Sequence, residues 1–469
     1  MLPVVALVGR PNVGKSTIFN CLTRTRDALV ADLPGLTRDR KYGYARVGPR
    51  PCVVIDTGGL VEVTHGVERL MAEQTLKAVE EADRVLLIVD ARAGCVPEDL
   101  HVADLLRRGG KTVLVVANKS ESLDPEIAGV DFHQLGFGAP VAVSAAHAQG
   151  IEELLERALD GIAPDPETSE AETADSEEIR VAVVGRPNVG KSTLINRLLG
   201  EERLVTFDQP GTTRDAVFVP FERDGQRYTL IDTAGVRRRA RVSDAVEKFS
   251  IVKALQAIDA AHVVIGVLDA HDTIAEQDAS LLGLINEQGR ALVIAVNKWD
   301  GIDPSQRDSI RDGVGLRLDF LAYAPVHYIS ARHGTGVGDL MGSVRMAFRA
   351  AMKELPTKDL NRALEQAVTM HQPPLVRGRR IKLRYAHQGG RNPPIVVIHG
   401  NQTQHVPDAY RRYLENHFRQ TFRLKGTPMR VEFRTDDNPF SGKRNVLTPR
   451  QQRKRVRLIK NKRAGTGKR

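Results

Sequence analysis

The sequence GRPNVGKST occurs at Gly9–Thr17 and recurs without a change at Gly185–Thr193, and the fold of this chain follows from that repeat. The two copies lie 176 residues apart. The same offset relates Pro34 to Pro210, Thr37-Arg38-Asp39 to Thr213-Arg214-Asp215, and Asp56-Thr57 to Asp232-Thr233, so about 50 residues align without a gap. Repetition on this scale indicates a duplicated domain. The sequence therefore predicts two copies of one module in tandem.

Each copy follows an apolar run and precedes a helix-length stretch, which is the context that a phosphate-binding loop requires. Its glycines let backbone N–H groups close around a β-phosphate, and the helix N-terminus adds positive potential. We expect Lys15 and Lys191 to bridge the β- and γ-phosphates, and the hydroxyls of Ser16 and Ser192 to bind Mg²⁺. A glycine-rich turn without a ligand would explain one copy, but not two identical ones. The predicted phosphate-binding residues are Gly9, Arg10, Pro11, Asn12, Val13, Gly14, Lys15 and Ser16, and Gly185, Arg186, Pro187, Asn188, Val189, Gly190, Lys191 and Ser192.

Strand and helix patterns alternate through both modules. Apolar runs such as Val4–Val8 and Val85–Val89, and later Val181–Val184 and Val263–Leu268, are separated by amphipathic stretches of helical length. This order predicts an α/β fold in each module, with a mostly parallel sheet and helices on both faces. The apolar start of the chain lacks a basic segment before it, so we expect a buried first strand and not a signal peptide.

Five segments are expected along the chain. The first module covers residues 1–163, an acidic linker 164–178, the second module 179–353, a small α+β domain 354–440, and a basic disordered tail 441–469. The linker, PDPETSEAETADSEE, holds seven acids and no base, so it cannot bury enough apolar surface to fold. In residues 354–440 the patterns follow the order α-β-β-α-β, with helices over Leu360–Met370 and Asp408–Phe422 and strands over Ile381–Tyr385, Ile395–His399 and Met429–Arg434.

Two further motifs complete the expected Mg²⁺ and phosphate site. Thr37 and Thr213 lie about twenty residues beyond the first helix of each module, where a switch threonine completes the Mg²⁺ shell when a γ-phosphate is bound. A simple turn former is the alternative for each. Asp56 and Asp232 follow strands and suit contact with Mg²⁺ through a bound water. The residues of these motifs are Asp56, Thr57, Gly58, Gly59 and Leu60, and Asp232, Thr233, Ala234, Gly235 and Val236.

The base-reading motifs differ between the modules. In the second module Asp300 can accept hydrogen bonds from N1–H and the exocyclic amine of guanine, which adenine cannot donate as a pair. In the first module Glu121 stands at that position and is one methylene longer. A poorer hydrogen-bond geometry would weaken guanine binding there, although GTP is still the expected nucleotide. The predicted residues are Asn118, Lys119, Ser120, Glu121, Ser144 and Ala145, and Asn297, Lys298, Trp299, Asp300, Ser330 and Ala331.

Charge is distributed unevenly along the chain. Residues 1–353 contain 41 Lys/Arg and 50 Asp/Glu, whereas residues 354–469 contain 27 Lys/Arg and 8 Asp/Glu. This asymmetry indicates an anionic partner for the C-terminal region, although a basic tail can also be merely solvated. No run approaches the ~20 apolar residues of a membrane span, and Cys21, Cys52 and Cys95 have no metal-ligand spacing. We expect a cytoplasmic protein with reduced thiols.

The twin loops, the acidic linker and the small basic α+β domain together resemble the Der (EngA) family of tandem GTPases, from Gly9 to about Phe440. The resemblance implies a KH-like C-terminal domain, GTP hydrolysis with Mg²⁺, and a monomer that acts in maturation of the large ribosomal subunit through rRNA. Two features depart from what it implies. Glu121 replaces the usual aspartate, and no GxxG loop lies between two helices of the C-terminal region.

The resemblance also bears on catalysis. Leu60 and Val236 occupy the position where Ras-like enzymes place a water-orienting glutamine, so intrinsic turnover should be slow. Related GTPases use K⁺ bound by an asparagine of the phosphate loop, which implies Asn12 and Asn188 as K⁺ ligands. The alternative for both is a loop-stabilising side chain. The predicted catalytic residues are Lys15, Asn12 and Thr37, and Lys191, Asn188 and Thr213.

The favoured function is a GTP-driven assembly factor for the large ribosomal subunit. The alternative is a signalling GTPase that acts through protein partners, but no amphipathic anchor or lipidation motif accompanies the basic tail. A tRNA-modification GTPase ranks lower, because residues for its additional chemistry are not found. The run Arg237–Arg241 is either a solvated surface or a nucleotide-dependent contact with RNA or another domain.

Overall fold

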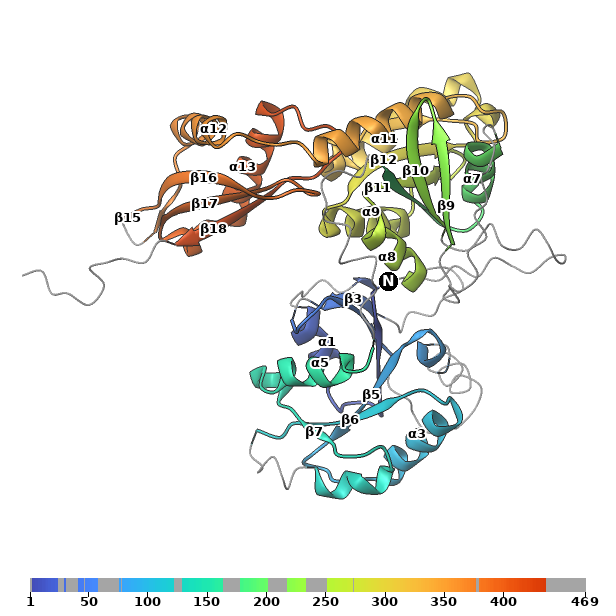
Figure 1. Ribbon diagram of the computed structural model, residues 1–469, viewed down its shortest axis with the longest axis vertical. Helices are drawn as coiled ribbons and strands as arrows, with labels where there is room; N and C mark the ends of the chain where they lie inside the picture. Colours follow the sequence, from blue (N-terminus) through green and yellow to red (C-terminus); the bar gives the residue numbers. More distant parts are fainter. Residues whose placement is uncertain are drawn as a thin grey trace, which may run out of the picture. The chain divides into compact units, whose positions relative to one another are not determined.

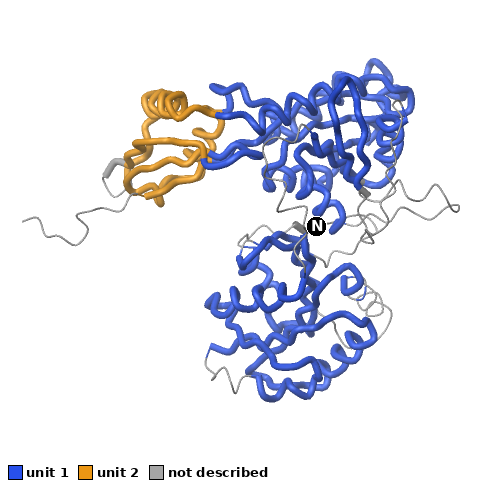
Figure 2. Tube along the Cα trace, in the orientation of Figure 1, with its two compact units in different colours: residues 1–354, 389–395, 419–430 blue, residues 355–388, 396–418, 431–469 orange. Residues whose placement is uncertain are grey.

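The computed structural model describes residues 2–23, 29–30, 41–45, 47–57, 76, 78–121, 129–162, 178–200, 217–232, 251–272, 274–376 and 379–435. Two compact units are distinguished in Figure 2. One contains residues 1–354, 389–395 and 419–430, and the other residues 355–388, 396–418 and 431–469. The predicted linker between the modules and the predicted tail lie outside the described residues, apart from Glu178 at the end of the linker.

The first module is built on a seven-stranded sheet in the order β2-β3-β4-β1-β5-β6-β7. Strands β1, β4, β5, β6 and β7 are parallel, and β2 and β3 pair antiparallel at one edge. The strands are β1 Val4–Val8, β2 Leu29–Val30, β3 Lys41–Ala45, β4 Cys52–Asp56, β5 Arg84–Asp90, β6 Val113–Asn118 and β7 Val141–Ala142. The helices are α1 Lys15–Thr23, α3 Pro97–Arg108 and α5 Ile151–Leu159, with 3-10 turns η1 Val130–Leu135 and η2 Ala145–His147.

Both faces of this sheet are covered by helices, as Figure 1 shows. Val5 and Leu7 of β1 pack in one core with residues of α1 and α5. Val4 and Ala6, which point to the opposite face, pack in another core with residues of α3. A central strand buried on both sides explains why β1 is a continuous apolar run without alternation.

The second module repeats this plan with a six-stranded sheet in the order β13-β12-β11-β8-β10-β9. Among the described strands of this sheet, β9 alone is antiparallel to its neighbour. The strands are β8 Ile179–Val184, β9 Val217–Arg223, β10 Gln226–Asp232, β11 Val263–Asp269, β12 Ala291–Asn297 and β13 Val326–Tyr328. The helices are α7 Lys191–Gly200, α8 Ile251–Ala260, α9 Glu276–Gln288, α10 Arg307–Arg317 and α11 Val337–Ala351, with 3-10 turns η4 Trp299–Gly301, η5 Pro304–Gln306 and η6 Asp319–Leu321.

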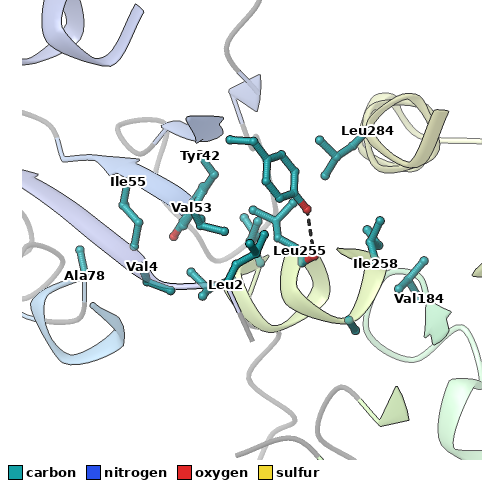
Figure 3. Packing of buried hydrophobic residues seen from close by; sticks show 14 of the residues in the cluster. Leu2, Val4, Tyr42, Val53, Ile55, Ala78, Val184, Leu255, Ile258 and Leu284 are labelled. Atoms are coloured by element: carbon teal, nitrogen blue, oxygen red, sulfur yellow. Dashed lines mark hydrogen bonds between the residues drawn. The ribbon is translucent and has the colours of Figure 1, made fainter. Parts of the chain in front are cut away.

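One apolar cluster of the larger unit contains residues of both modules (Figure 3). It includes Leu2 and Tyr42 from the first module, and Leu255 and Ile258 from α8 of the second. The hydroxyl of Tyr44 donates a hydrogen bond to the Leu255 carbonyl at 2.9 Å, so the polar group that enters this cluster has a partner.

The C-terminal region forms a three-stranded sheet in the order β16-β17-β18 with two helices. Its elements are α12 Thr357–Met370, β14 Leu375–Val376, β15 Arg379–Arg380, β16 Lys382–Gly390, β17 Ile395–Asn401, the 3-10 turn η7 Thr403–His405, α13 Asp408–Thr421 and β18 Arg430–Thr435. The predicted α-β-β-α-β order is confirmed, and the antiparallel pair β14–β15 is added to it. The α/β class of the two modules is confirmed as well. Among the described residues, no helix is both long and apolar enough to cross a membrane.

Candidate functional site

The two phosphate loops close around their own lysines. The Lys15 amino group donates to the carbonyls of Gly9 and Arg10 at 2.9 and 2.8 Å, and only 6% of the residue is exposed. Lys191 repeats the contact by donating to the Arg186 carbonyl at 2.8 Å. Burial lowers the Lys15 pKa to about 8, against an upward effect of Asp56. An ammonium group held this way can exchange weak carbonyl partners for phosphate oxygens.

Gly14 and Gly190 are required by a close approach inside each site. Their φ angles are 94° and 96°, and a Cβ on either would collide with the side-chain amide of Asn118 or Asn297. Asn118 donates to the Val13 carbonyl at 2.8 Å and accepts from the Ala145 N–H at 3.1 Å. This asparagine therefore joins the phosphate loop to the loop that is predicted to read the base.

The second module contains the same bridge. Asn297 donates to the Val189 carbonyl at 2.9 Å and accepts from the Ala331 N–H at 2.9 Å. The lysine that follows each asparagine has a left-handed backbone, with φ of 67° at Lys119 and 64° at Lys298. Lys119 donates to the Asn12 carbonyl at 2.8 Å and to Asp90 at 2.7 Å. The asparagine thus couples the phosphate loop to the predicted base-reading loop by the same two hydrogen bonds in both modules.

The predicted Mg²⁺ residues of the first module lie together. The Ser16 hydroxyl donates to Asp56 Oδ2 at 2.8 Å, while Asp56 Oδ1 is buried and has no hydrogen-bond partner among the residues that the structure describes. Burial raises the Asp56 pKa, and the hydrogen bond from Ser16 opposes the shift. A buried carboxylate oxygen without a partner fits a water bound to a metal ion, because such a water would supply the missing donor.

Asn12 and Asn188, the predicted K⁺ ligands, both adopt left-handed backbone with φ of 64°. Asparagine tolerates this conformation better than most residues. Each asparagine therefore suits the backbone turn of the phosphate loop, whether or not its side chain also binds K⁺. Thr57, another predicted site residue, is 2% exposed, and its hydroxyl donates to the Leu7 carbonyl at 2.7 Å. The Thr57 side chain is therefore buried and hydrogen-bonded to strand β1.

The carboxylates that are predicted to read the base, Glu121 and Asp300, both accept a hydrogen bond from the predicted serine. Ser144 Oγ donates to Glu121 Oε2 at 2.9 Å. The pKa of Glu121 is lowered by its own backbone N–H and by Ser144. The pKa of Asp300 is lowered above all by Ser330. The longer Glu121 therefore reaches the serine as Asp300 does, and both carboxylates are held in the ionised form that guanine donors need.

The predicted switch residues are not among the residues that the structure describes. Thr37, Gly58, Gly59, Leu60, Thr213, Thr233, Ala234, Gly235, Val236 and the Arg237–Arg241 run all lie outside the described residues. Asp232 is described only as the last residue of β10, where its backbone pairs with Val217.

Several residues of the site were missed by the sequence analysis. A buried aspartate in the first turn of a helix contacts the arginine of each phosphate loop, with Asp99 Oδ1 3.4 Å from Arg10 Nε and Asp278 Oδ1 2.8 Å from Arg186 Nε. The two aspartates are 179 residues apart, so extending the repeat with a small gap would have found them. Another pair supports the base-reading loop, because Cys21 and Arg197 donate to the carbonyls of Ala145 and Ala331 at 3.1 and 3.3 Å.

Comparisons with known proteins agree with this geometry. A family described as "50S ribosome-binding GTPase" matches residues 4–119 and 180–298, and the "KH-domain-like of EngA bacterial GTPase enzymes, C-terminal" matches residues 354–434. "GTPase Der" of Thioalkalivibrio sulfidiphilus is 59% identical over 461 residues, covering 98% of this chain and 99% of the relative. "GTPase Der" of Hahella chejuensis is 56% identical over 461 residues, covering 98% and 97%. With two phosphate-loop modules, a KH-like C-terminal region and relatives of this identity over nearly its full length, the chain belongs to the Der (EngA) family of GTPases.

Proposed function

We propose that both modules bind and hydrolyse GTP, and that their nucleotide state controls binding of the chain to the large ribosomal subunit through rRNA. The observation that carries the proposal is the duplicated bridge from phosphate loop to base loop, made by Asn118 and Asn297. Two complete bridges support two working sites, with Glu121 and Asp300 accepting from the guanine N1–H and amine. The family description "50S ribosome-binding GTPase" supports the partner.

In each module we assign the lysine and the serine of the phosphate loop to the phosphates and to Mg²⁺. Lys15 and Lys191 would neutralise charge on the β- and γ-phosphates, and Ser16 and Ser192 would bind the ion. Mg²⁺ supplies further neutralisation of charge when bound. Thr37 and Thr213 would close the switches on the γ-phosphate.

Slow turnover and stimulation by K⁺ form part of the proposal. Leu60 and Val236 cannot orient a water molecule, and Asn12 and Asn188 would place a cation beside the phosphates. GTP hydrolysis should be several-fold faster in KCl than in NaCl at equal ionic strength, as measured by phosphate release. Asn12→Ala together with Asn188→Ala should remove the difference. Equal wild-type rates in the two salts would contradict the K⁺ role.

The C-terminal region supports an anionic partner. It contains 27 Lys/Arg against 8 Asp/Glu, and Lys358, Arg362 and Arg384 line a depression beside α12, together with Asp359 and Glu365. Clustered cations provide the sequence-independent part of RNA affinity through phosphate contacts. We therefore assign rRNA contact to this region and the timing of release to GTP hydrolysis.

Sedimentation with ribosomal subunits tests the proposal. The chain is mixed with subunits in GDP, in a non-hydrolysable GTP analogue, or without nucleotide. Co-migration with the large subunit in one nucleotide state only is the expected result. Lys15→Ala and Lys191→Ala, tested separately, should show which module controls binding. Free protein in every state would instead favour the signalling alternative, with protein partners.

A further inference from the structure

We propose that Arg92 is a positioning residue for guanine recognition in the first module, where it holds the longer side chain of Glu121 in place. The inference rests on the proposed reading of guanine by Glu121. It concerns a residue outside the phosphate-loop and base-reading motifs, and it explains how a glutamate can serve where the second module uses Asp300.

The contacts of Glu121 define the arrangement. The Arg92 guanidinium donates to Glu121 Oε1, and the Ser144 hydroxyl donates to Oε2 at 2.9 Å. Each carboxylate oxygen therefore has one side-chain donor, and the backbone N–H of Glu121 also donates to the same group. A carboxylate offers about four lone-pair positions, so the group can still accept a hydrogen bond from guanine. The Glu121 side chain is 18% exposed, compared with 55% for Arg92.

Arg92 is itself held in position by the site. Its backbone N–H donates to Asp90 Oδ1 at 3.0 Å, while Asp90 Oδ2 accepts from the Lys119 amino group at 2.7 Å. Asp90 thus connects the turn that carries Arg92 to the loop that carries Glu121. An arginine anchored at its backbone can fix a carboxylate more effectively than a freely moving one.

The second module provides the contrast within the same chain. The residue that corresponds to Arg92 is His271, whose Nδ1 lies 3.4 Å from Asp269 Oδ1. Asp300 instead has His333 Nε2 at 3.4 Å from its Oδ2. The shorter carboxylate of Asp300 is therefore not held by a guanidinium from this turn. An arginine occupies the position in the module that has the glutamate, and a histidine in the module that has the aspartate.

The physical reason is the additional torsion of glutamate. Ordering a rotatable side chain costs conformational entropy, and a longer carboxylate samples more positions when it is free. If Arg92 orders the Glu121 side chain in the absence of nucleotide, guanine binding causes a smaller loss of conformational entropy. Removing Arg92 should therefore weaken the contacts that Glu121 makes and leave those of the phosphates unchanged.

The experiment measures GDP and IDP affinity of the first module in the full chain. Asp300→Asn replaces the carboxylate that is predicted to accept from guanine in the second module, and so weakens nucleotide binding there. The measured affinity then reports on the first module. Arg92→Ala should weaken GDP binding by up to about fivefold, because Arg92 is more than half exposed and acts on guanine through Glu121. IDP lacks the exocyclic amine, so its affinity should fall less and the GDP/IDP ratio should decrease. Arg92→Lys should restore part of the affinity.

A double-mutant cycle separates positioning from a general effect. In a Glu121→Asp background, Arg92→Ala should change GDP affinity by less than about twofold, because the shorter side chain needs no support. An equal loss in both backgrounds, an equal loss for GDP and IDP, or no loss at all would overturn the proposal. His271→Ala, in a chain with Asp300 intact, is the matched control and should leave GDP binding to the second module unchanged.

Glu121→Ala distinguishes failure of this inference from failure of the proposed function. Guanine selectivity of the first module should be lost in that variant. If selectivity persists, Glu121 does not read guanine and the underlying assignment is wrong. If it is lost while Arg92→Ala has no effect, only the positioning role of Arg92 is wrong.

Discussion

At the scale of single residues, Lys15 is a buried lysine whose charged form is destabilised by the loss of water around it. The residue is 6% exposed, and burial lowers its pKa from 10.5 to about 8. Among the described residues, the Gly9 and Arg10 carbonyls and the neighbouring Asp56 favour the charged form. Phosphate anions would favour that form much more strongly, so nucleotide binding should return the pKa towards its ordinary value.

This shift predicts proton uptake when GDP binds to the first module. Around pH 9 the free Lys15 is largely neutral and the bound Lys15 is charged, so most of one proton should be taken up. Near pH 7 both forms are charged and uptake at Lys15 should be small. Calorimetry in buffers of different ionisation enthalpy measures the protons, with Lys15→Ala giving the contribution of the second module. Identical uptake in wild type and variant would show that the Lys15 pKa is not shifted.

At the scale of elements, each phosphate loop is attached to a neighbouring helix by a buried aspartate. Asp278, in the first turn of α9, accepts from the Ala275 N–H at 3.1 Å and from Arg186 Nε at 2.8 Å. The side chain thus caps the helix and pairs with the loop at the same time. Arg186 has a second acidic partner in Asp272 at 3.1 Å, and the Asp272 side chain is 56% exposed.

Asp278→Asn should therefore lower the free energy of unfolding of the second module by about 2 kcal/mol, through loss of the charge-assisted bond. The only tryptophan of the chain is Trp299, which lies in this module. Its fluorescence during urea denaturation consequently reports on the relevant transition. Asp272→Asn, at the exposed partner, is the control and should cost less than about 0.5 kcal/mol. Equal effects of the two changes would argue against a structural role for the buried pair.

At the scale of the whole molecule, charge is divided between the nucleotide-binding and C-terminal parts. Residues 1–353 are net acidic and residues 354–469 strongly basic, with 12 Lys/Arg and no acid from Lys443 onward. Under the proposed function, two GTPase modules would control RNA binding by one basic region.

The charge division predicts salt-sensitive RNA binding. The logarithm of rRNA affinity should fall linearly with the logarithm of salt concentration, since each phosphate contact releases counterions. A chain that ends at residue 440 lacks the 12 basic residues from Lys443 onward and should bind more weakly with a shallower slope. Filter binding across a salt series measures both. Identical slopes for the two chains would exclude the tail from RNA contact.

Much of the fold could be predicted, because its strands are continuous apolar runs. Val4–Val8 was predicted as a strand and is β1, and the helix expected over Leu360–Met370 is found as α12, Thr357–Met370. The antiparallel strands β3 and β9 were not predicted. The pair β14–β15 was also missed, since two-residue strands are too short to show a period.

The two modules, their phosphate loops and the predicted base-reading residues follow from the amino-acid sequence alone, because each is a contiguous motif that depends on neighbours in the chain. The distant groups that support these motifs are known only from the folded structure. Arg92 lies 29 residues from Glu121, and Asn118 lies 105 residues from Val13. Contacts of this kind arise where parallel strands end at one edge of a sheet, and local pattern cannot specify which side chains meet there.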